Sequence, residues 1–329
     1  MFHPMRQRLI NLIPVYEDWS ALRVLLEKID KELVNSEHEV SVLIVDDASV
    51  TPPPEDLLEK RQVIAGIRIV RLKVNLGHQR AIAIGLSYAQ ANLPQGTVVI
   101  LDADGEDRPE DISRLFQRSV ETGGRHVVFA ERAIRSESLM FRMFYWLYRF
   151  LFRVSTGRRI RFGNFSLIPP SLLRRIVALP DVWNNYAAAL VKARLPLQMV
   201  ACSRAPRLMG KSKMGLIGLI LHGLSAISVH SEVFGARALI ASSVVMFAAL
   251  VLGSIATVIR LTTNLAIPGW ATYAVGLSII VVLQGVTLTV FFVFLILHSR
   301  NSTPFVPGRD YEYFIEEVRE SRRREPVSL

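Results

Sequence analysis

Residues 97–107 read TVVILDADGED, and this stretch sets the expectation for the whole fold. Its first part, TVVI, is a short apolar run that is typical of a buried strand. If the strand continues into the acidic part, the alternation of side chains places Asp102 and Asp104 on the same side of it. These two carboxylates, with Glu106 nearby, are oxygen ligands of the kind that Mg²⁺ and Mn²⁺ prefer. The stretch therefore predicts a metal site that would hold a diphosphate, while the plainer interpretation is an acidic turn after a strand.

The surrounding sequence alternates between strand-like and helix-like patterns up to about residue 132. Apolar runs rich in Val, Ile and Leu predict strands at 9–15, 40–46, 67–74, 98–102 and 126–130. Helical spacing of apolar residues predicts helices at 19–34, 79–91 and 111–121. This alternation favours an α/β fold with a mostly parallel sheet that is covered by helices on both faces.

The predicted strand ends carry the polar residues of interest. Tyr16-Glu17, Asp46-Asp47 and Asp102-Ala103-Asp104 each follow a predicted strand directly or close its end. Ligands of parallel sheets bind beyond the carboxyl ends of the strands. We therefore expect these three groups to converge on one site.

Composition limits the classes of partner and compartment. The chain has 329 residues, a net charge of +10 and 50% hydrophobic residues, which favours an anionic partner such as a phosphate substrate or a membrane surface. A nucleic acid is not expected, because the basic residues are not arranged as a recognition helix and zinc-ligand spacing is absent from the sequence. Cys202 is the only cysteine, which excludes an intrachain disulfide and fits a reducing compartment. The apolar run at 9–15 is too short for a signal peptide, so the first part of the chain is expected to stay in the cytosol.

Two uncharged apolar stretches, 238–259 and 271–297, predict a transmembrane hairpin. Each exceeds the ~20 residues that a helix needs to cross a bilayer. Arg237 and Arg300 flank the shared side of this hairpin, in weak agreement with a cytosolic catalytic part. We accordingly expect an integral membrane protein, in the inner or plasma membrane if the source is bacterial.

Three further segments have open interpretations. Residues 139–154 combine aromatic residues with an arginine stripe, which favours an interfacial helix over an ordinary core helix. Residues 214–229 are read as a surface or re-entrant helix, with a third membrane span as the alternative. The tail at 298–329 mixes Arg and Glu and is expected to be a solvated helix or disordered.

Five motifs in order carry a family resemblance: IPVYE at 13–17, IVDDAS at 44–49, NLG at 75–77, DADGEDRPE at 102–110 and RLMGKSKM at 207–214. Together they resemble family 2 inverting glycosyltransferases with a GT-A fold. The last motif is similar to the R-x-x-G-x-S-K segment of the polyprenyl-phosphate glycosyltransferases within that family, such as dolichyl-phosphate mannose synthases and undecaprenyl-phosphate glycosyltransferases. The resemblance covers almost all of residues 9–300 and implies a nucleotide-sugar-binding core.

The resemblance also implies roles for individual residues. The nucleotide sugar would be bound by Pro14, Tyr16, Glu17, Asp46, Asp47 and Asp102. Mg²⁺ or Mn²⁺ would be held by Asp102, Asp104 and Glu106, where Glu replaces the Gln of the family pattern. The catalytic residues would be Asp104, Arg132 and Arg135, and the acceptor phosphate would be bound by Arg207, Lys211 and Lys213. The alternatives are structural: carboxylates that cap turns or helices, arginines on the surface and lysines that flank a membrane.

The implied function is transfer of a sugar from a nucleoside diphosphate, UDP or GDP, to a polyprenyl phosphate at the cytosolic face. Asn164 stands in a segment where the family often has an acidic residue, so a catalytic base is not evident there. A phosphate acceptor needs no base, since its second pKa lies near ~6. An alcohol on another membrane lipid or a glycan would need one, with Asp107 or Glu131 as candidates. A non-catalytic sugar-nucleotide-binding membrane subunit is the remaining alternative.

These expectations divide the chain into four parts. Residues 1–137 would form the nucleotide-sugar-binding core and 138–235 an acceptor-side region with interfacial helices. Residues 236–299 would form the transmembrane hairpin and 300–329 a cytosolic tail. The oligomeric state stays open, although a homotetramer would resemble some members of the family.

Overall fold

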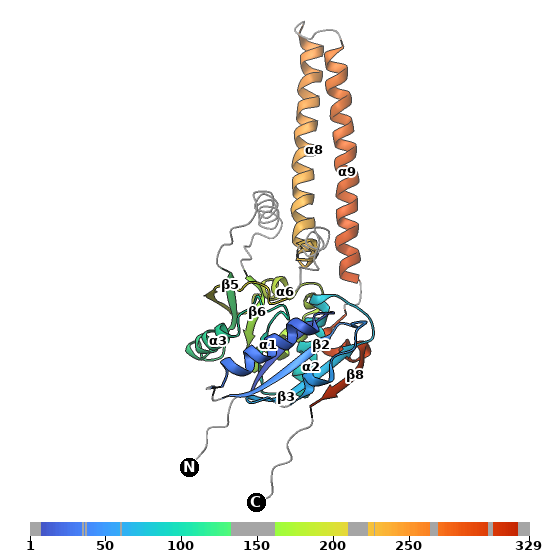
Figure 1. Cartoon of the computed structure of the whole chain (residues 1–329). Coiled ribbons are helices and arrows are strands. Elements are labelled where there is room, and N and C mark those ends of the chain that lie inside the picture. The colour runs from blue at the N-terminus through green and yellow to red at the C-terminus, as the bar shows by residue number, and fades with distance from the viewer. Residues whose placement is uncertain are drawn as a thin grey trace, which may run out of the picture. The chain divides into compact units, whose positions relative to one another are not determined.

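The computed structural model describes residues 8–34, 36, 38–59, 61–132, 162–209, 223–226, 228–263, 269–301 and 305–321. These residues form two compact units (Figure 1). The first contains all the strands, and the second contains two long helices. The predicted interfacial helix at 139–154, and most of the segment 214–229, lie outside the described residues.

An eight-stranded sheet with the order β7-β5-β6-β4-β1-β2-β3-β8 organises the first unit. Its strands are β1 (Arg8–Val15), β2 (Glu39–Asp46), β3 (Ile64–Leu72), β4 (Thr97–Ile100), β5 (Val127–Arg132), β6 (Phe162–Ile168), β7 (Leu197–Cys202) and β8 (Ile315–Glu320). Strand β1 pairs in parallel with β2 and β4, β2 with β3, and β5 with β7. Strand β6 is antiparallel to β4 and β5, and β8 is antiparallel to β3. The prediction of a mostly parallel α/β sheet is therefore confirmed, and the five predicted strands agree with β1 to β5 within a few residues.

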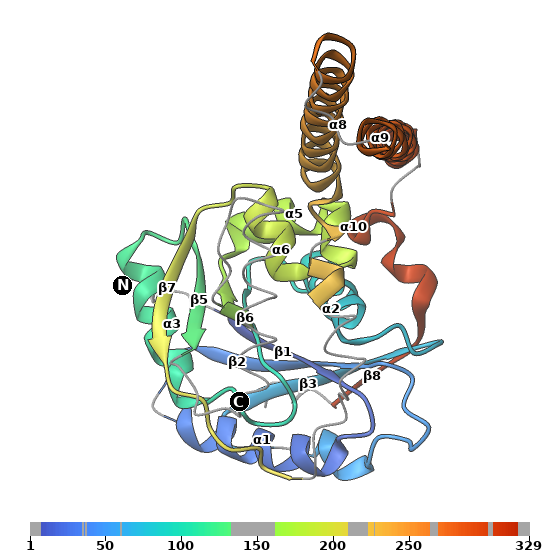
Figure 2. The same ribbon diagram turned by 90° about the horizontal axis from the view of Figure 1, so that it is seen from above.

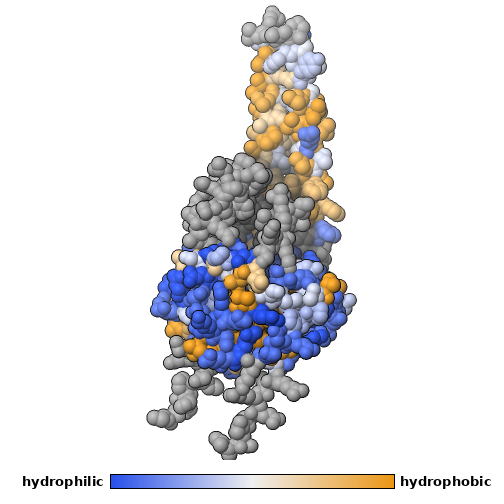
Figure 3. Space-filling model, in the orientation of Figure 1, coloured by the Kyte–Doolittle hydropathy of each residue, from blue (hydrophilic) through white to orange (hydrophobic). Residues whose placement is uncertain are grey.

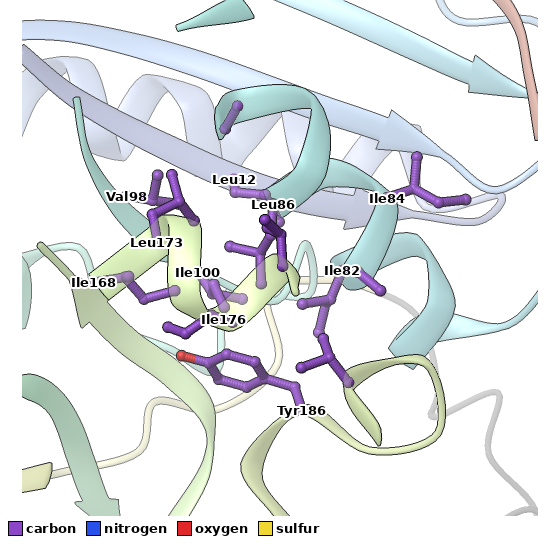
Figure 4. Close-up of a cluster of buried hydrophobic side chains, with 14 of the residues drawn as sticks. Leu12, Ile82, Ile84, Leu86, Val98, Ile100, Ile168, Leu173, Ile176 and Tyr186 are labelled. Carbon is purple, nitrogen blue, oxygen red and sulfur yellow. The ribbon is translucent and has the colours of Figure 1, made fainter. Parts of the chain in front are cut away.

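Helices cover both faces of this sheet (Figure 2). The helices of the first unit are α1 (Trp19–Glu32), α2 (His78–Asn92), α3 (Glu110–Glu121), α5 (Pro170–Val177), α6 (Tyr186–Lys192) and α10 (Pro307–Asp310), with 3₁₀ turns η1 (Glu55–Leu58), η2 (Pro180–Trp183) and η3 (Tyr311–Phe314). One buried cluster joins the sheet to α2, α5 and α6, and Figure 4 shows part of it around Leu12, Leu86 and Tyr186. A second cluster joins the other face to α1 and α3. Alternate residues of β1 to β5 belong to alternate clusters, which explains why these strands are continuous apolar runs in the sequence.

Helix α2 approaches the sheet closely through Gly85. A Cβ atom at this position would lie 2.7 Å from Cδ1 of Leu12 and 2.8 Å from Cγ2 of Val45. The helix therefore needs a glycine where it crosses β1 and β2. This contact matters for function because α2 begins at His78, next to the acidic loop after β4.

The C-terminal segment, residues 305–321, corrects the prediction for the tail. The expected solvated helix or disordered chain is wrong for Ile315–Glu320, which forms strand β8 at the edge of the sheet. Phe314 and Ile315 pack against the α2-side cluster, and the ring of Phe305 contacts that of Trp183, with the two centroids 4.0 Å apart. The charged residues of β8 suggested a solvated tail, yet charge is common on exposed edge strands.

The second unit consists of α8 (Ser231–Thr262) and α9 (Trp270–Asn301). Both are long and apolar enough to cross a membrane, by length and composition. Hydrophobic residues dominate the visible surface of these helices (Figure 3). The two helices pack on each other through small and polar residues, with Gly253 against Ser278 and Ser242 Oγ 3.3 Å from Thr289 Oγ1. The predicted stretches 238–259 and 271–297 lie within them.

Replacing Gly85 with Val should lower the free energy of unfolding by about 1–3 kcal/mol, because added volume at a tight contact forces α2 away from the sheet. The measurement is thermal melting of the purified protein. Gln90→Val, at a half-buried position of the same helix, is the control for the helix propensity of valine. Equal melting temperatures for the two variants would contradict the close approach of α2.

Candidate active site at the carboxyl ends of the strands

The carboxyl ends of β1, β2, β3 and β4 lie along one edge of the sheet, because these strands are parallel. The loops that follow them carry the polar motifs of the sequence: 16–18 after β1, 47–51 after β2, 73–77 after β3 and 101–109 after β4. The predicted convergence of these motifs on one edge agrees with this topology. The contacts within the edge fall into two groups, one around β1 and β2 and one around β4.

The loops after β1 and β2 are locked together. Glu17 and Ala48 have φ angles of 57° and 56°, in the left-handed region that residues other than glycine rarely adopt. The Glu17 amide donates to Ser49 Oγ at 2.9 Å, and the Ser49 amide donates to Asp46 Oδ1 at 2.9 Å. Glu17 Oε1 in turn accepts from the amide of Thr51 at 3.0 Å. Unusual backbone angles persist where surrounding contacts over-determine them, and such places are often ligand sites.

Asp46 and Asp47 are both buried, with exposed fractions of 0% and 3%. Burial raises the pKa of Asp46, against hydrogen bonds from Ser49 and the charge of Arg71. Burial also raises the pKa of Asp47, although the amides of Leu76 and Gly77 donate to its carboxylate at 2.7 and 2.8 Å. Asp47 therefore holds the loop that leads into α2, as the structural alternative predicted.

The remaining residues predicted from the IPVYE motif differ in accessibility. Pro14 is buried within β1, where it pairs with Val45 of β2. Tyr16 is 42% exposed at the end of the same strand. Of these three residues, Tyr16 and the half-buried Glu17 present side-chain surface at this edge.

The acidic residues after β4 lie in a turn, not on the strand. Strand β4 ends at Ile100, so the expectation that strand alternation aligns Asp102 and Asp104 is wrong. The turn is instead shaped by Gly105, whose φ is +74° and whose missing Cβ leaves room for the side chain of Leu208. The amide of Glu106 donates to Asp104 Oδ1 at 3.0 Å.

Residues 204–208 lie along the acidic turn and bring two arginines to it. The Ala205 amide donates to the Glu106 carbonyl, and the Leu208 amide donates to the Asp104 carbonyl, both at 3.0 Å. This pairing places Arg204 in an ion pair with Glu106. It also places Arg207 Nη2 at 3.6 Å from Asp104 Oδ2 and 3.4 Å from Asp18 Oδ2, so that Arg207 joins the loops after β1 and β4.

His78, the first residue of α2, lies beside the acidic turn. Its Nε2 lies 3.1 Å from Asp102 Oδ1 and 3.1 Å from Asn164 Nδ2. Burial lowers the pKa of His78, but the charge of Asp102 and the hydrogen bond to it outweigh burial, so that the pKa is raised above its ordinary value. Asn164 Oδ1 accepts from Gln79 Nε2 at 3.1 Å, and Gln79 Oε1 accepts from the Tyr186 amide at 2.8 Å. A hydrogen-bonded network thus connects the acidic turn to α2, β6 and α6.

The carboxylates of the acidic turn determine how well a divalent cation fits there. Burial and the charge of Asp102 raise the pKa of Asp104. A hard divalent cation held by both carboxylates would relieve the repulsion between them. Glu106, by contrast, pairs with Arg204. Among the residues that the structure describes, three His, Cys, Asp or Glu side chains do not gather around one metal position. The predicted set of three carboxylates is therefore not assembled here, and Asp102 with Asp104 is the part that fits.

The structure does not describe the side chains of several predicted residues. Arg135, Lys211 and Lys213 lie outside the described residues, and Arg132 is described only by its backbone, opposite Cys202 at the end of β5. Conversely, sequence reasoning missed His78, Arg204 and Asp18. The signals were present, because His78 follows the NLG motif, Arg204 precedes Arg207 by three residues, and Asp18 follows Tyr16-Glu17.

Comparison with known proteins agrees with this geometry. The model of the family described as "Glycosyl transferase family 2" matches residues 12–179. The chain is 26% identical to the uncharacterized glycosyltransferase YkcC of Bacillus subtilis, over 67% of this chain and 68% of that protein. It is 25% identical to the uncharacterized glycosyltransferase sll0501 of Synechocystis sp., over 85% and 87% of the two chains. It is also 25% identical to the undecaprenyl-phosphate 4-deoxy-4-formamido-L-arabinose transferase of Klebsiella pneumoniae, over 66% of each chain.

A solved structure shows the same fold. Glucosyl-3-phosphoglycerate synthase from Mycobacterium tuberculosis, in complex with Mn²⁺, UDP-glucose and phosphoglyceric acid, superimposes with a TM-score of 0.51 at 14% identity. The similarity covers 70% of this chain and 80% of that one. With the family match over half of the sequence and a mostly parallel sheet of the GT-A type, the chain belongs to glycosyl transferase family 2.

Proposed function

We propose that this protein is a membrane-bound inverting glycosyltransferase that moves a sugar from a nucleoside diphosphate to a polyprenyl phosphate. The observation that carries the proposal is the position of Arg207, which touches both the acidic turn and the loop after β1. Arg207 also begins the R-x-x-G-x-S-K segment, so one residue links the donor edge of the sheet to the segment assigned to the acceptor. The relative from Klebsiella pneumoniae, which is named for undecaprenyl phosphate, supports the choice of acceptor.

The donor would lie along the edge formed by the loops after β1, β2 and β4. Tyr16 and Glu17 are exposed or half-buried there and would contact the nucleoside, with Asp46 beneath them. Mg²⁺ or Mn²⁺ would be held by Asp102 and Asp104, and when bound it would neutralise the departing nucleoside diphosphate. We propose that the donor is a hexose linked to UDP or GDP.

The acceptor would be a phosphate, and the chain's basic residues would bind it. Arg207 is held by Asp18 and Asp104, so its guanidinium is already oriented before a phosphate arrives. Arginine suits this role because its planar fork binds phosphate through two hydrogen bonds. Lys211, Lys213, Arg132 and Arg135 are proposed as further phosphate ligands, and Arg132 and Arg135 would align the acceptor for catalysis.

A phosphate acceptor also fits Asn164, which stands in a segment where the family often has an acidic residue. With a second pKa near ~6, a phosphate monoester is ionised at neutral pH and attacks the anomeric carbon without losing a proton. Its oxygen forms the new bond as the bond to the nucleoside diphosphate breaks, which inverts the configuration. Asp107, a candidate base for an alcohol acceptor, is 5% exposed and accepts from the Asp102 amide at 3.1 Å, so that its carboxylate is engaged in shaping the turn.

The proposed location follows from the long helices. Helices α8 and α9 would cross the membrane as a hairpin and hold the catalytic unit at the cytosolic face, where a polyprenyl phosphate exposes its headgroup. The proposed boundaries are 1–137 for the nucleotide-sugar-binding core, 138–235 for the acceptor side and 236–299 for the hairpin. The residues after 300 include β8, which supports assigning them to the core. A homotetramer remains a proposal.

The proposal predicts transfer of labelled sugar from a UDP- or GDP-sugar to undecaprenyl phosphate in detergent, with Mg²⁺ or Mn²⁺ present. The expected product is an acid-labile labelled lipid that extracts into chloroform, because the new linkage is a glycosyl phosphate. Diacylglycerol and the lipid-free reaction are the matched acceptor controls. Two results would contradict the proposed acceptor. One is labelled product with diacylglycerol but not with undecaprenyl phosphate, and the other is binding of a donor without product from any UDP- or GDP-sugar.

Replacing Asp104 with Ala should reduce transfer by roughly 10²- to 10³-fold while leaving the melting temperature unchanged or higher. The reason is that partial burial and the charge of Asp102 raise the pKa of Asp104, so that its charge is unfavourable to the folded state. The measurement is initial rate together with thermal melting. Glu121→Ala at the end of α3, where the carboxylate forms an ion pair with Arg118, is the control. Normal turnover by the Asp104 variant would refute its assignment.

A further inference from the structure

The C-terminal segment reaches the donor edge of the sheet. Because β8 runs antiparallel to β3, the start of β8 lies at the carboxyl end of β3, with Ile315 opposite Leu72. The Lys73 amide donates to the Phe314 carbonyl at 2.9 Å, and Lys73 Nζ donates to the Tyr313 carbonyl at 2.7 Å. Residues more than 200 positions apart in the sequence therefore meet beside the loop after β2.

Arg71 connects the C-terminal segment to the loop after β2. Its Nε donates to Glu316 Oε2 at 3.1 Å, and its Nη2 donates to the Ser49 carbonyl at 3.2 Å. Its Nε also lies 3.9 Å from Asp46 Oδ2. One guanidinium thus joins the C-terminal segment to the loop that Glu17 and Ser49 lock in place.

Burial decides which of these groups a ligand can reach. Asp46 has an exposed fraction of 0%, whereas the side chain of Arg71 is 23% exposed. Among the described residues, Asp46 Oδ2 has no hydrogen-bond donor, and the guanidinium of Arg71 lies beside it. Because Asp46 is buried and Arg71 beside it is partly exposed, a ligand at this edge can reach Arg71 but not Asp46.

We propose that Arg71 is the nucleobase-contacting cation of the donor site and that Glu316, from the C-terminal segment, is its positioning residue. This inference rests on the proposed function. The guanidinium would donate to a carbonyl oxygen of the base, which both uracil and guanine possess. Glu316 and the Ser49 carbonyl fix its orientation from two sides, and Asp46 acts through Arg71 rather than by touching the ligand. The chain beyond the hairpin thereby becomes part of the donor site.

The same pair of strands offers a matched control. Arg68 Nε lies 2.7 Å from Glu320 Oε1, in a second ion pair between β3 and β8 with similar exposure. This pair is at the opposite end of the β3–β8 ladder, away from the loop after β2. Glu316→Gln and Glu320→Gln each remove one ion pair between the same strands, but only the first changes the support of Arg71.

The experiment is isothermal titration of UDP and of GDP, with Mn²⁺ present, into the full-length protein and the two variants. Glu316→Gln should weaken binding of the nucleotide that the wild type prefers by about three- to tenfold, as expected for losing a hydrogen bond to a charged group. Glu320→Gln should leave the affinity within about twofold, since an exposed ion pair contributes little by itself. Glu316→Asp should restore part of the affinity.

The outcomes separate this inference from the proposed function. Nucleotide binding by the wild type with equal affinities for Glu316→Gln and Glu320→Gln would overturn the role of Glu316 and leave the proposed function standing. Binding of neither nucleotide by the wild type would overturn both. The melting temperatures of Glu316→Gln and Glu320→Gln are measured as a control. A general loss of structure would lower both of them alike. In transfer assays, Glu316→Gln should raise the KM for the donor and leave the KM for the acceptor unchanged.

Discussion

Repulsion between carboxylates is the constraint on which the candidate site depends. Asp18, Asp102, Asp104 and Glu106 are gathered by the loops after β1 and β4, and Arg204, Arg207 and His78 lie against them. A buried charge without a partner costs several kcal/mol, so these acids require nearby cations in the free protein. The cations come from α2 and from the segment after β7, which means that the site forms only when distant parts of the chain are in place. A cation or a phosphate that enters the site would exchange with partners that are already present.

The fold supplies this arrangement through backbone contacts. Asp47 holds the loop before α2 by accepting two amides, Gly85 lets α2 lie close to β1 and β2, and His78 then reaches Asp102. The segment after β7 follows the acidic turn through two backbone hydrogen bonds, which orient Arg204 and Arg207. The charged groups are thus positioned by ordered backbone and not by surface side chains alone. Such preorganisation is what electrostatic stabilisation of a leaving group requires.

The sequence predicted strands β1 to β5 because apolar strands and amphipathic helices carry local periodicity, but it did not predict β6, β7 and β8. It also predicted that the acidic motifs would meet, since parallel strands end at one edge. Strand β8 was missed because its sequence, IEEVRE, alternates weakly and its partner is over 200 positions away. The alternation argument for Asp102 and Asp104 failed because Gly105 turns the chain after β4 ends. The pairing of Glu106 with Arg204 could not be predicted either, because it depends on how β7 is placed in the sheet.

The central claim is that the acidic turn binds a nucleoside diphosphate together with a divalent cation. The most direct test is titration of UDP and GDP into the wild-type protein and into Asp104→Ala, each with and without Mn²⁺. The account predicts that Mn²⁺ tightens nucleotide binding to the wild type by about tenfold or more, since the cation offsets the charge of both the turn and the diphosphate. It predicts that this effect disappears in the variant. Equal affinity with and without Mn²⁺ in the wild type, or an undiminished effect of Mn²⁺ in Asp104→Ala, would contradict it.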